Sequence, residues 1–101
     1  MEYKNKKIDI KVLQDAARML KSVAHPLKLR IIEALESNQR MSVSELMSWL
    51  KEDQVPVSKA LGSLKKAGIL KSATQGNLRV YQIEYKNVFN LLNCIRMHKK
   101  G

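Results

Sequence analysis

The chain has 101 residues, 45% of them hydrophobic, and a formal net charge of +10 at pH 7. This length allows one hydrophobic core but not two, so we expect a single domain over residues 1–101, with residues 1–7 disordered. Apolar residues never occur more than two in a row, which excludes a membrane span and a signal peptide. The single cysteine excludes a disulfide framework and a multi-cysteine zinc finger. We therefore expect a cytoplasmic protein.

Two amphipathic helices are predicted first. Apolar residues recur at helical spacing between Ile8 and Ala24, namely at Ile8, Val12, Leu13, Ala16, Leu20 and Val23. Pro26 fits the first turn of a helix and keeps His25 out of the helical region. The second helix should therefore run from Pro26 to about Glu36, with Leu27, Ile31, Ile32 and Leu35 buried.

Two shorter helices should follow the loop "ESNQRM". Ser42 and Glu45 have the spacing of a capping box, which predicts a helix over residues 43–50. Its inward residues would be Leu46, Met47 and Leu50, with Trp49 at the edge of the core. After the four-residue turn "KEDQ" comes Val55-Pro56 and a fourth helix to about Ala67, which Gly68 would end. The inward face of this helix would carry Val57, Ala60, Leu61, Leu64 and Ala67.

The sequence period changes after Leu70. The stretch "LKSATQGNLRVYQI" has two extended runs on either side of Gln75-Gly76-Asn77, which predicts a β-hairpin. A last helix should begin near Lys86 and carry Val88, Leu91, Leu92 and Ile95. The fold class is therefore mainly α with a small β-hairpin, in the order α-α-α-α-β-β-α.

Positive charge is concentrated in the second half of the chain. No Asp or Glu occurs from Gln54 to Ile83, whereas this stretch contains Lys59, Lys65, Lys66, Lys71 and Arg79. Such a charge favours nucleic acid, an anionic membrane surface or ribosomal packing as the partner. A basic surface that only confers solubility also fits.

Two short helices, a tight turn and a hairpin together predict a winged helix-turn-helix. The helix-turn-helix would span residues 43–67 and the wing residues 70–84. The outer face of the fourth helix would be small, polar and cationic, with Val55, Ser58, Lys59, Gly62 and Lys66. The stretch without acids would then be the recognition helix and the wing.

Four segments, "AHPLKLRIIEAL", "VSELMSWL", "VPVSKALGSLKKAGIL" and "KSATQGNLRVYQI", resemble the ArsR/SmtB family of bacterial winged-helix repressors. The resemblance covers Leu20 to Ile83 in order and spacing. It implies a homodimer through the first and last helices, the latter over residues 86–98, and binding to a palindromic operator in double-stranded DNA. The interface would include Val12, Leu13, Val88, Leu91, Leu92 and Ile95.

The resemblance also implies which residues contact DNA. Base contacts would come from the start of the fourth helix, at Gln54, Val55, Ser58 and Lys59. Many members have histidine where Lys59 stands, and a lysine can donate to guanine or hold a phosphate. The wing residues Gln75, Asn77 and Arg79 would contact the backbone or minor groove. Phosphate attraction would come from Lys65, Lys66 and Lys71.

Two metal sites of the family are incomplete in this sequence. The positions of its C-x-C-D/E-L pattern hold Ser42, Ser44, Glu45 and Leu46, and serine is a poor ligand for soft metals. The positions of its other site hold Tyr85, Asn87, His98 and Gly101, of which only His98 is a match. We therefore expect neither a metal nor a cofactor.

Cys94 and His98 leave alternatives open. Their i, i+4 spacing can place them on one helix face, and two copies would give a Cys2His2 set across a dimer. A redox switch is a second alternative. With one cysteine per chain, Cys94 could form a disulfide only with Cys94 of the other copy in a dimer. The simpler interpretation is a small interface cysteine and a solvated histidine.

The predicted function is that of a homodimeric, sequence-specific DNA-binding repressor without the standard metal-sensing sites. No catalytic triad and no glycine-rich phosphate loop occurs, so we expect no enzyme. Two alternatives stay open: a nucleic-acid-binding protein without sequence preference, and an adaptor whose winged helix docks an acidic protein. The operator, the target genes and any effector stay unassigned, as does the choice between repressor and activator.

Overall fold

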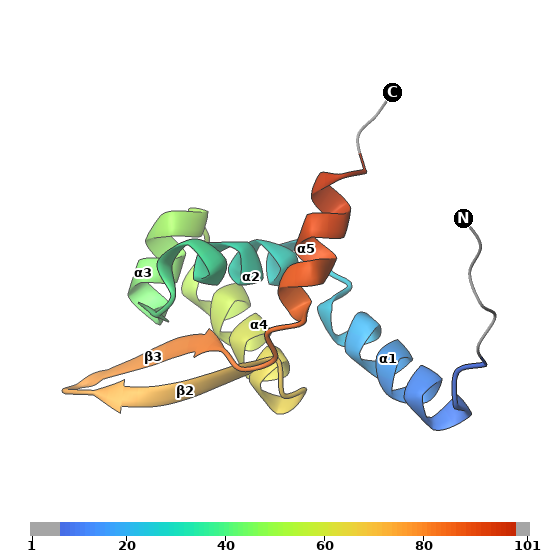
Figure 1. The fold of residues 1–101 in the computed structure, drawn as a ribbon. Coiled ribbons are helices and arrows are strands. Elements are labelled where there is room, and N and C mark those ends of the chain that lie inside the picture. The colour runs from blue at the N-terminus through green and yellow to red at the C-terminus, as the bar shows by residue number, and fades with distance from the viewer. Residues whose placement is uncertain (1–6, 99–101) are drawn as a thin grey trace.

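The computed structural model describes residues 7–98. Its elements are α1 (Ile10–Val23), α2 (Pro26–Asn38), β1 (Met41–Ser42), α3 (Val43–Leu50), α4 (Gln54–Lys66), β2 (Leu70–Gln75), β3 (Leu78–Ile83) and α5 (Val88–Arg96) (Figure 1). The predicted mainly helical fold with a hairpin is confirmed. Of residues 1–7, for which disorder was predicted, only Lys7 is among the described residues. Gly101, one of the family metal positions, also lies outside them.

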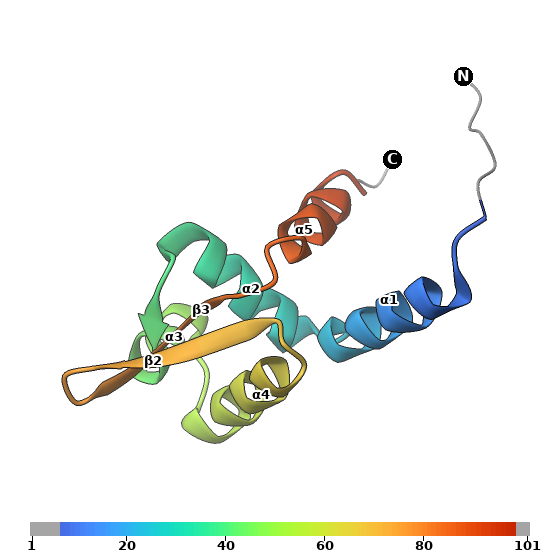
Figure 2. The same ribbon diagram turned by 60° about the horizontal axis from the view of Figure 1, so that its bottom comes forward.

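The core lies where α2, α3 and α4 meet the sheet. Its largest fully buried side chains come from nearly every element: Val23, Ile31, Ile32, Leu35, Leu46, Val57, Leu61, Leu64, Ile69 and Val88. In contrast, α1 extends away from this body (Figure 2), and it reaches the core only near its C-terminal end, through Met19 and Val23. Within residues 7–98 no helix is long and apolar enough to cross a membrane.

The sheet has three antiparallel strands in the order β1-β3-β2. The β2–β3 register runs from Leu70 opposite Ile83 to Gln75 opposite Leu78, so Gly76 and Asn77 form a two-residue turn. Gly76 has a φ of +63°, and a positive φ at the first turn position is what a type II′ hairpin requires. The hairpin projects beyond the helices as a wing (Figure 1).

Strand β1 was not predicted: Met41 was expected in a loop and Ser42 in the capping box of the next helix. Met41 pairs with Tyr81 and Ser42 pairs with Val80. Two residues are too few to produce the alternating pattern by which a strand is recognised in a sequence. The strand anchors the start of α3 to the sheet.

Several helix predictions need correction. α2 extends to Asn38, α5 begins only at Val88, and α4 begins at Gln54. Pro56 thus lies within the first turn of α4, where a backbone N–H has no helical partner in any case. Trp49 is 53% exposed instead of lying at the core edge, and Ala67 is exposed because it follows the last turn of α4.

Candidate nucleic-acid interface

The start of α3 is fixed by the predicted capping box. The Ser42 hydroxyl accepts a hydrogen bond from the Glu45 backbone N–H at 3.2 Å, and the Glu45 carboxylate accepts one from the Ser42 backbone N–H at 2.8 Å. Two donors that the first helical turn leaves unpaired are thereby satisfied. This confirms the sequence prediction and also occupies the serine that stands at a family metal position.

The end of α3 and the turn into α4 are held just as firmly. Arg30 on α2 donates to the Leu50 carbonyl at 3.0 Å, and the Glu52 N–H donates to the Met47 carbonyl at 3.1 Å. Lys51 adopts a left-handed conformation with a φ of 55°. The turn between α3 and α4 is three residues long, Lys51 to Asp53, one fewer than predicted.

Two opposite faces of α4 have opposite chemistry. The inner face is buried through Val57, Ala60, Leu61 and Leu64. Residues predicted to read bases lie on the exposed side, where Val55 is 72% exposed and Gln54, Ser58 and Lys59 are exposed as well. Val55 thus presents an apolar side chain on the exposed side of α4.

Gly62 lies in the middle of this exposed face. An added Cβ at Gly62 would meet no atom of the chain within 4 Å, so packing inside the protein does not require a glycine. Glycine in a helix interior costs about 1 kcal/mol relative to alanine. Packing within the chain therefore gives no reason for a glycine at this position.

The predicted wing residues lie on β2, β3 and their turn. Gln75, Asn77 and Arg79 are all exposed, and Arg79 donates to the Ser72 hydroxyl at 3.4 Å across the hairpin. The Lys71 ammonium lies 3.4 Å from a carboxylate oxygen of Glu84. This pair was not predicted, because the stretch considered as free of acids ends at Ile83 and Glu84 lies directly after it.

The lysines of α4 have no such counter-ion. Over residues 7–98 the ion pairs are Arg18–Asp15, Lys71–Glu84 and Arg96–Glu36, and none includes Lys59, Lys65 or Lys66. Lys65 and Lys66 lie in the last turn of α4, where a positive charge also favours the helix dipole. The cationic side of α4 is thus left for an anionic partner.

The predicted dimer residues divide into two groups. Val12, Leu13 and Ile95 are exposed and Leu91 is half-buried, whereas Val88 and Leu92 lie in the core of this chain. Further exposed apolar residues on or beside the same two helices are Ile8, Ile10, Leu20 and Met97. α1 and α5 therefore present apolar surface that the chain itself does not cover.

An ion pair links α5 to α2. The Arg96 guanidinium lies 2.6 Å from the Glu36 carboxylate, and it also donates to Asn93 at 2.8 Å. Its hydrogen bond to Glu36 raises the pKa of Arg96 above the ordinary value. This contact joins residues far apart in sequence and was not predicted.

The metal candidates stay isolated in the described part of the chain. Cys94 and His98 are both exposed on α5 or just after it, as are Tyr85 and Asn87 before it. Over residues 7–98 no three His, Cys, Asp or Glu side chains are grouped so that they could hold a metal ion.

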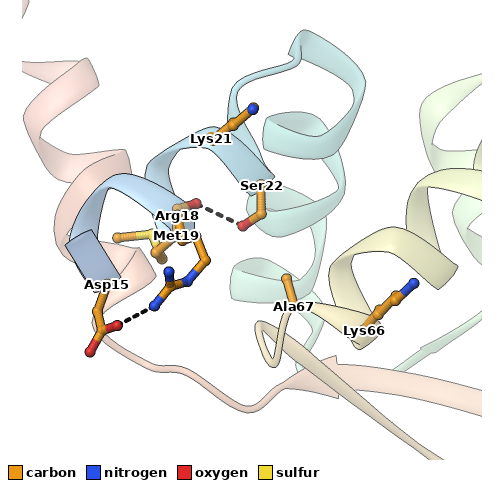
Figure 3. Close-up of a pocket in the computed structure, with 7 residues that line it drawn as sticks. All are labelled: Asp15, Arg18, Met19, Lys21, Ser22, Lys66 and Ala67. Carbon is orange, nitrogen blue, oxygen red and sulfur yellow. Dashed lines mark hydrogen bonds and ion pairs between the residues drawn. The ribbon is translucent and has the colours of Figure 1, made fainter. Parts of the chain in front are cut away.

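A hollow between α1 and the end of α4 was also not predicted (Figure 3). Arg18 pairs with Asp15 there, and the Ser22 hydroxyl donates to the Met19 carbonyl at 2.7 Å. Lys21 and Lys66 point away from these groups (Figure 3). Asp15, Arg18 and Ser22 thus already have partners within α1.

A helix-turn-helix with a hairpin wing places this protein in the winged-helix class. Transcriptional repressor PagR of Bacillus anthracis is 32% identical over 93 residues, which cover 89% of this chain and 93% of PagR. Its crystal structure matches with a TM-score of 0.78 at 29% identity, over 86% of this chain and 99% of that chain. HlyU from Vibrio cholerae matches with a TM-score of 0.78 at 26% identity, over 87% of this chain and 96% of that one.

An uncharacterised HTH-type transcriptional regulator of Methanocaldococcus jannaschii is 32% identical over 82 residues, which cover 81% of this chain and 92% of the relative. A scan against models of known protein families finds no match. The chain belongs to the ArsR/SmtB-type family of winged-helix transcriptional regulators. It is accordingly a DNA-binding transcriptional regulator and not an enzyme.

Proposed function

We propose that the chain acts as a homodimeric repressor that binds a palindromic operator. The observation that supports this best is the exposed face of α4, which has three lysines without a counter-ion among residues 7–98 and a mid-helix glycine that internal packing does not require. An α-helix of this kind fits the major groove, whose width is about 12 Å. Because its partner would be DNA, the protein would act in the cytoplasm.

Base reading would come from the first two turns of α4. A Gln side chain can bind adenine through two hydrogen bonds, a Lys can donate to guanine, and an apolar side chain can contact the thymine methyl group. Gln54, Lys59 and Val55 supply these three chemistries, and Ser58 adds a hydroxyl. The wing residues Gln75, Asn77 and Arg79 would contact the adjacent backbone or minor groove, and Lys65, Lys66 and Lys71 would attract phosphates.

Dimerisation would use the uncovered apolar sides of α1 and α5. Val12 and Leu13 on α1 are 54% and 46% exposed, and Ile95 on α5 is 46% exposed. Val88 and Leu92 would support this surface from the core, and Leu91 would take part from its edge. Two copies joined in this way would present two recognition helices to half-sites about 34–36 Å apart.

Repression would be steric, because a dimer on two adjacent major grooves excludes other proteins from that DNA. The test is a binding titration with duplex DNA at several salt concentrations, combined with the mass of the complex. If each subunit neutralises about four phosphates, log K against log salt should have a slope of about −7. Two chains per duplex are expected. A monomeric complex, or binding without any salt dependence, would contradict the proposal.

A further inference from the structure

A second hollow, of about 400 Å³, lies where the start of α2 meets α4. It is lined by His25, Leu27, Lys28, Pro56, Lys59, Ala60 and Ser63. Three of these residues have cationic or N–H-donating side chains, and none is acidic. From the sequence, His25 was expected only at a helix boundary, and no role was predicted for Lys28.

The Lys28 side chain is held in place without being neutralised. Its ammonium donates to the Ser63 hydroxyl at 2.9 Å, across 35 positions of sequence. Lys28 is half-buried, and none of the ion pairs formed among residues 7–98 includes it. One hydrogen bond to a neutral hydroxyl leaves two of the three ammonium donors and the full charge available to an anion.

His25 adds a donor of defined position to the same hollow. Its Nδ1 accepts a hydrogen bond from the Leu27 backbone N–H at 3.1 Å. In a neutral imidazole one nitrogen accepts and the other carries the hydrogen, so Nε2 is the donor here. The hollow thus combines an oriented ammonium, a second lysine and an imidazole N–H, a set of groups that suits a phosphate.

The position of the hollow on α4 indicates which phosphate. Pro56, Lys59, Ala60 and Ser63 form one stripe of this helix, and at 3.6 residues per turn the stripe lies roughly a third of a turn from the face with Val55, Ser58 and Gly62. A helix about 10–12 Å wide in a groove about 12 Å wide turns its flanks to the two sugar-phosphate backbones. Lys59 belongs to both the face and the flank.

We infer that this hollow, with Lys28 as its main cation, binds a backbone phosphate of the operator beside the groove occupied by α4. The inference rests on the proposed DNA-binding function and adds a contact from Lys28 on α2, which precedes the helix-turn-helix and the wing. The contact would position α4 without reading sequence, because phosphates are the same at every step. Lys28→Gln should therefore weaken binding on every duplex by a similar factor.

Fluorescence anisotropy with a labelled duplex at several NaCl concentrations tests this. A dimer has two copies of the hollow, so Lys28→Gln should make the salt slope less steep by about 2 and reduce affinity roughly tenfold or more near 0.15 M salt. Lys28→Arg keeps the charge and should keep the slope. Ser63→Ala removes the hydrogen bond but not the charge, and should likewise leave the slope near the wild-type value.

Lys86→Gln is the control, because it also removes one lysine charge, but from an exposed side chain near Glu36 and Gln39 at the far end of α2. Equal slopes for Lys28→Gln and Lys86→Gln, with wild-type helix content in both, would overturn the inference. A changed base preference in Lys28→Gln would overturn it as well. If the wild-type protein binds no duplex, the proposed function itself has failed.

Discussion

Gly62→Ala should make the protein more stable and its DNA complex weaker. Gly62 is exposed in the interior of α4, and an added Cβ would meet no atom of the chain within 4 Å. The substitution therefore adds no clash and removes backbone freedom from the unfolded chain, which stabilises the helix by about 1 kcal/mol. If α4 enters the major groove with this face, the new methyl group occupies space needed for close approach to DNA, and affinity should fall about tenfold.

Urea unfolding followed by circular dichroism measures the first effect. With an m-value of about 1–1.5 kcal/mol/M for a small domain, the midpoint should rise by roughly 0.7–1 M at unchanged m and equal protein concentration. Gly68→Ala is the control, because Gly68 has a φ of +83° and alanine should destabilise the protein there. A Gly62→Ala protein that is no more stable would refute the structural reasoning, and undiminished DNA affinity would refute the close approach.

Further substitutions test other parts of the proposed complex. Lys59→Ala should weaken binding and change the preferred base at one half-site position, as measured by competition between duplexes; equal weakening on every sequence would make Lys59 a phosphate contact only. Arg79→Ala should mainly flatten the salt slope, by about 2 for a dimer, and an unchanged slope would remove the wing from the contacts. Leu13→Glu, which puts a charge on the exposed side of α1, should shift the protein to monomers in analytical ultracentrifugation; an intact dimer would place the interface elsewhere.

Local sequence signals were sufficient for most of the fold. Pro26, the Ser42–Glu45 capping box and Gly68 each mark a helix end through the chemistry of one turn, and the structure has helix ends at these positions. Gly76 marks the wing turn in the same way. Helical periodicity predicted the outer face of α4, because the buried residues of the opposite face repeat every three or four positions.

Contacts between distant segments could not be predicted in this way. The Lys28–Ser63 and Arg96–Glu36 contacts join residues 35 and 60 positions apart, and only the packing of α2 against α4 and α5 brings them together. Trp49 was misplaced because apolar character alone does not tell which side of a short helix meets the core. For α5, likewise, periodicity did not separate Val88 and Leu92, which face the core, from Ile95, which is exposed.

Selection of bound duplexes from a random DNA pool, at near-physiological salt with reductant and chelator present, tests the proposed operator binding most directly. We expect enrichment of an inverted repeat whose half-sites are about one helical turn apart, read by α4 of two subunits without any metal. Binding without an enriched sequence would contradict this and favour a nucleic-acid-binding protein that reads no sequence. The absence of binding would favour an adaptor that docks another protein.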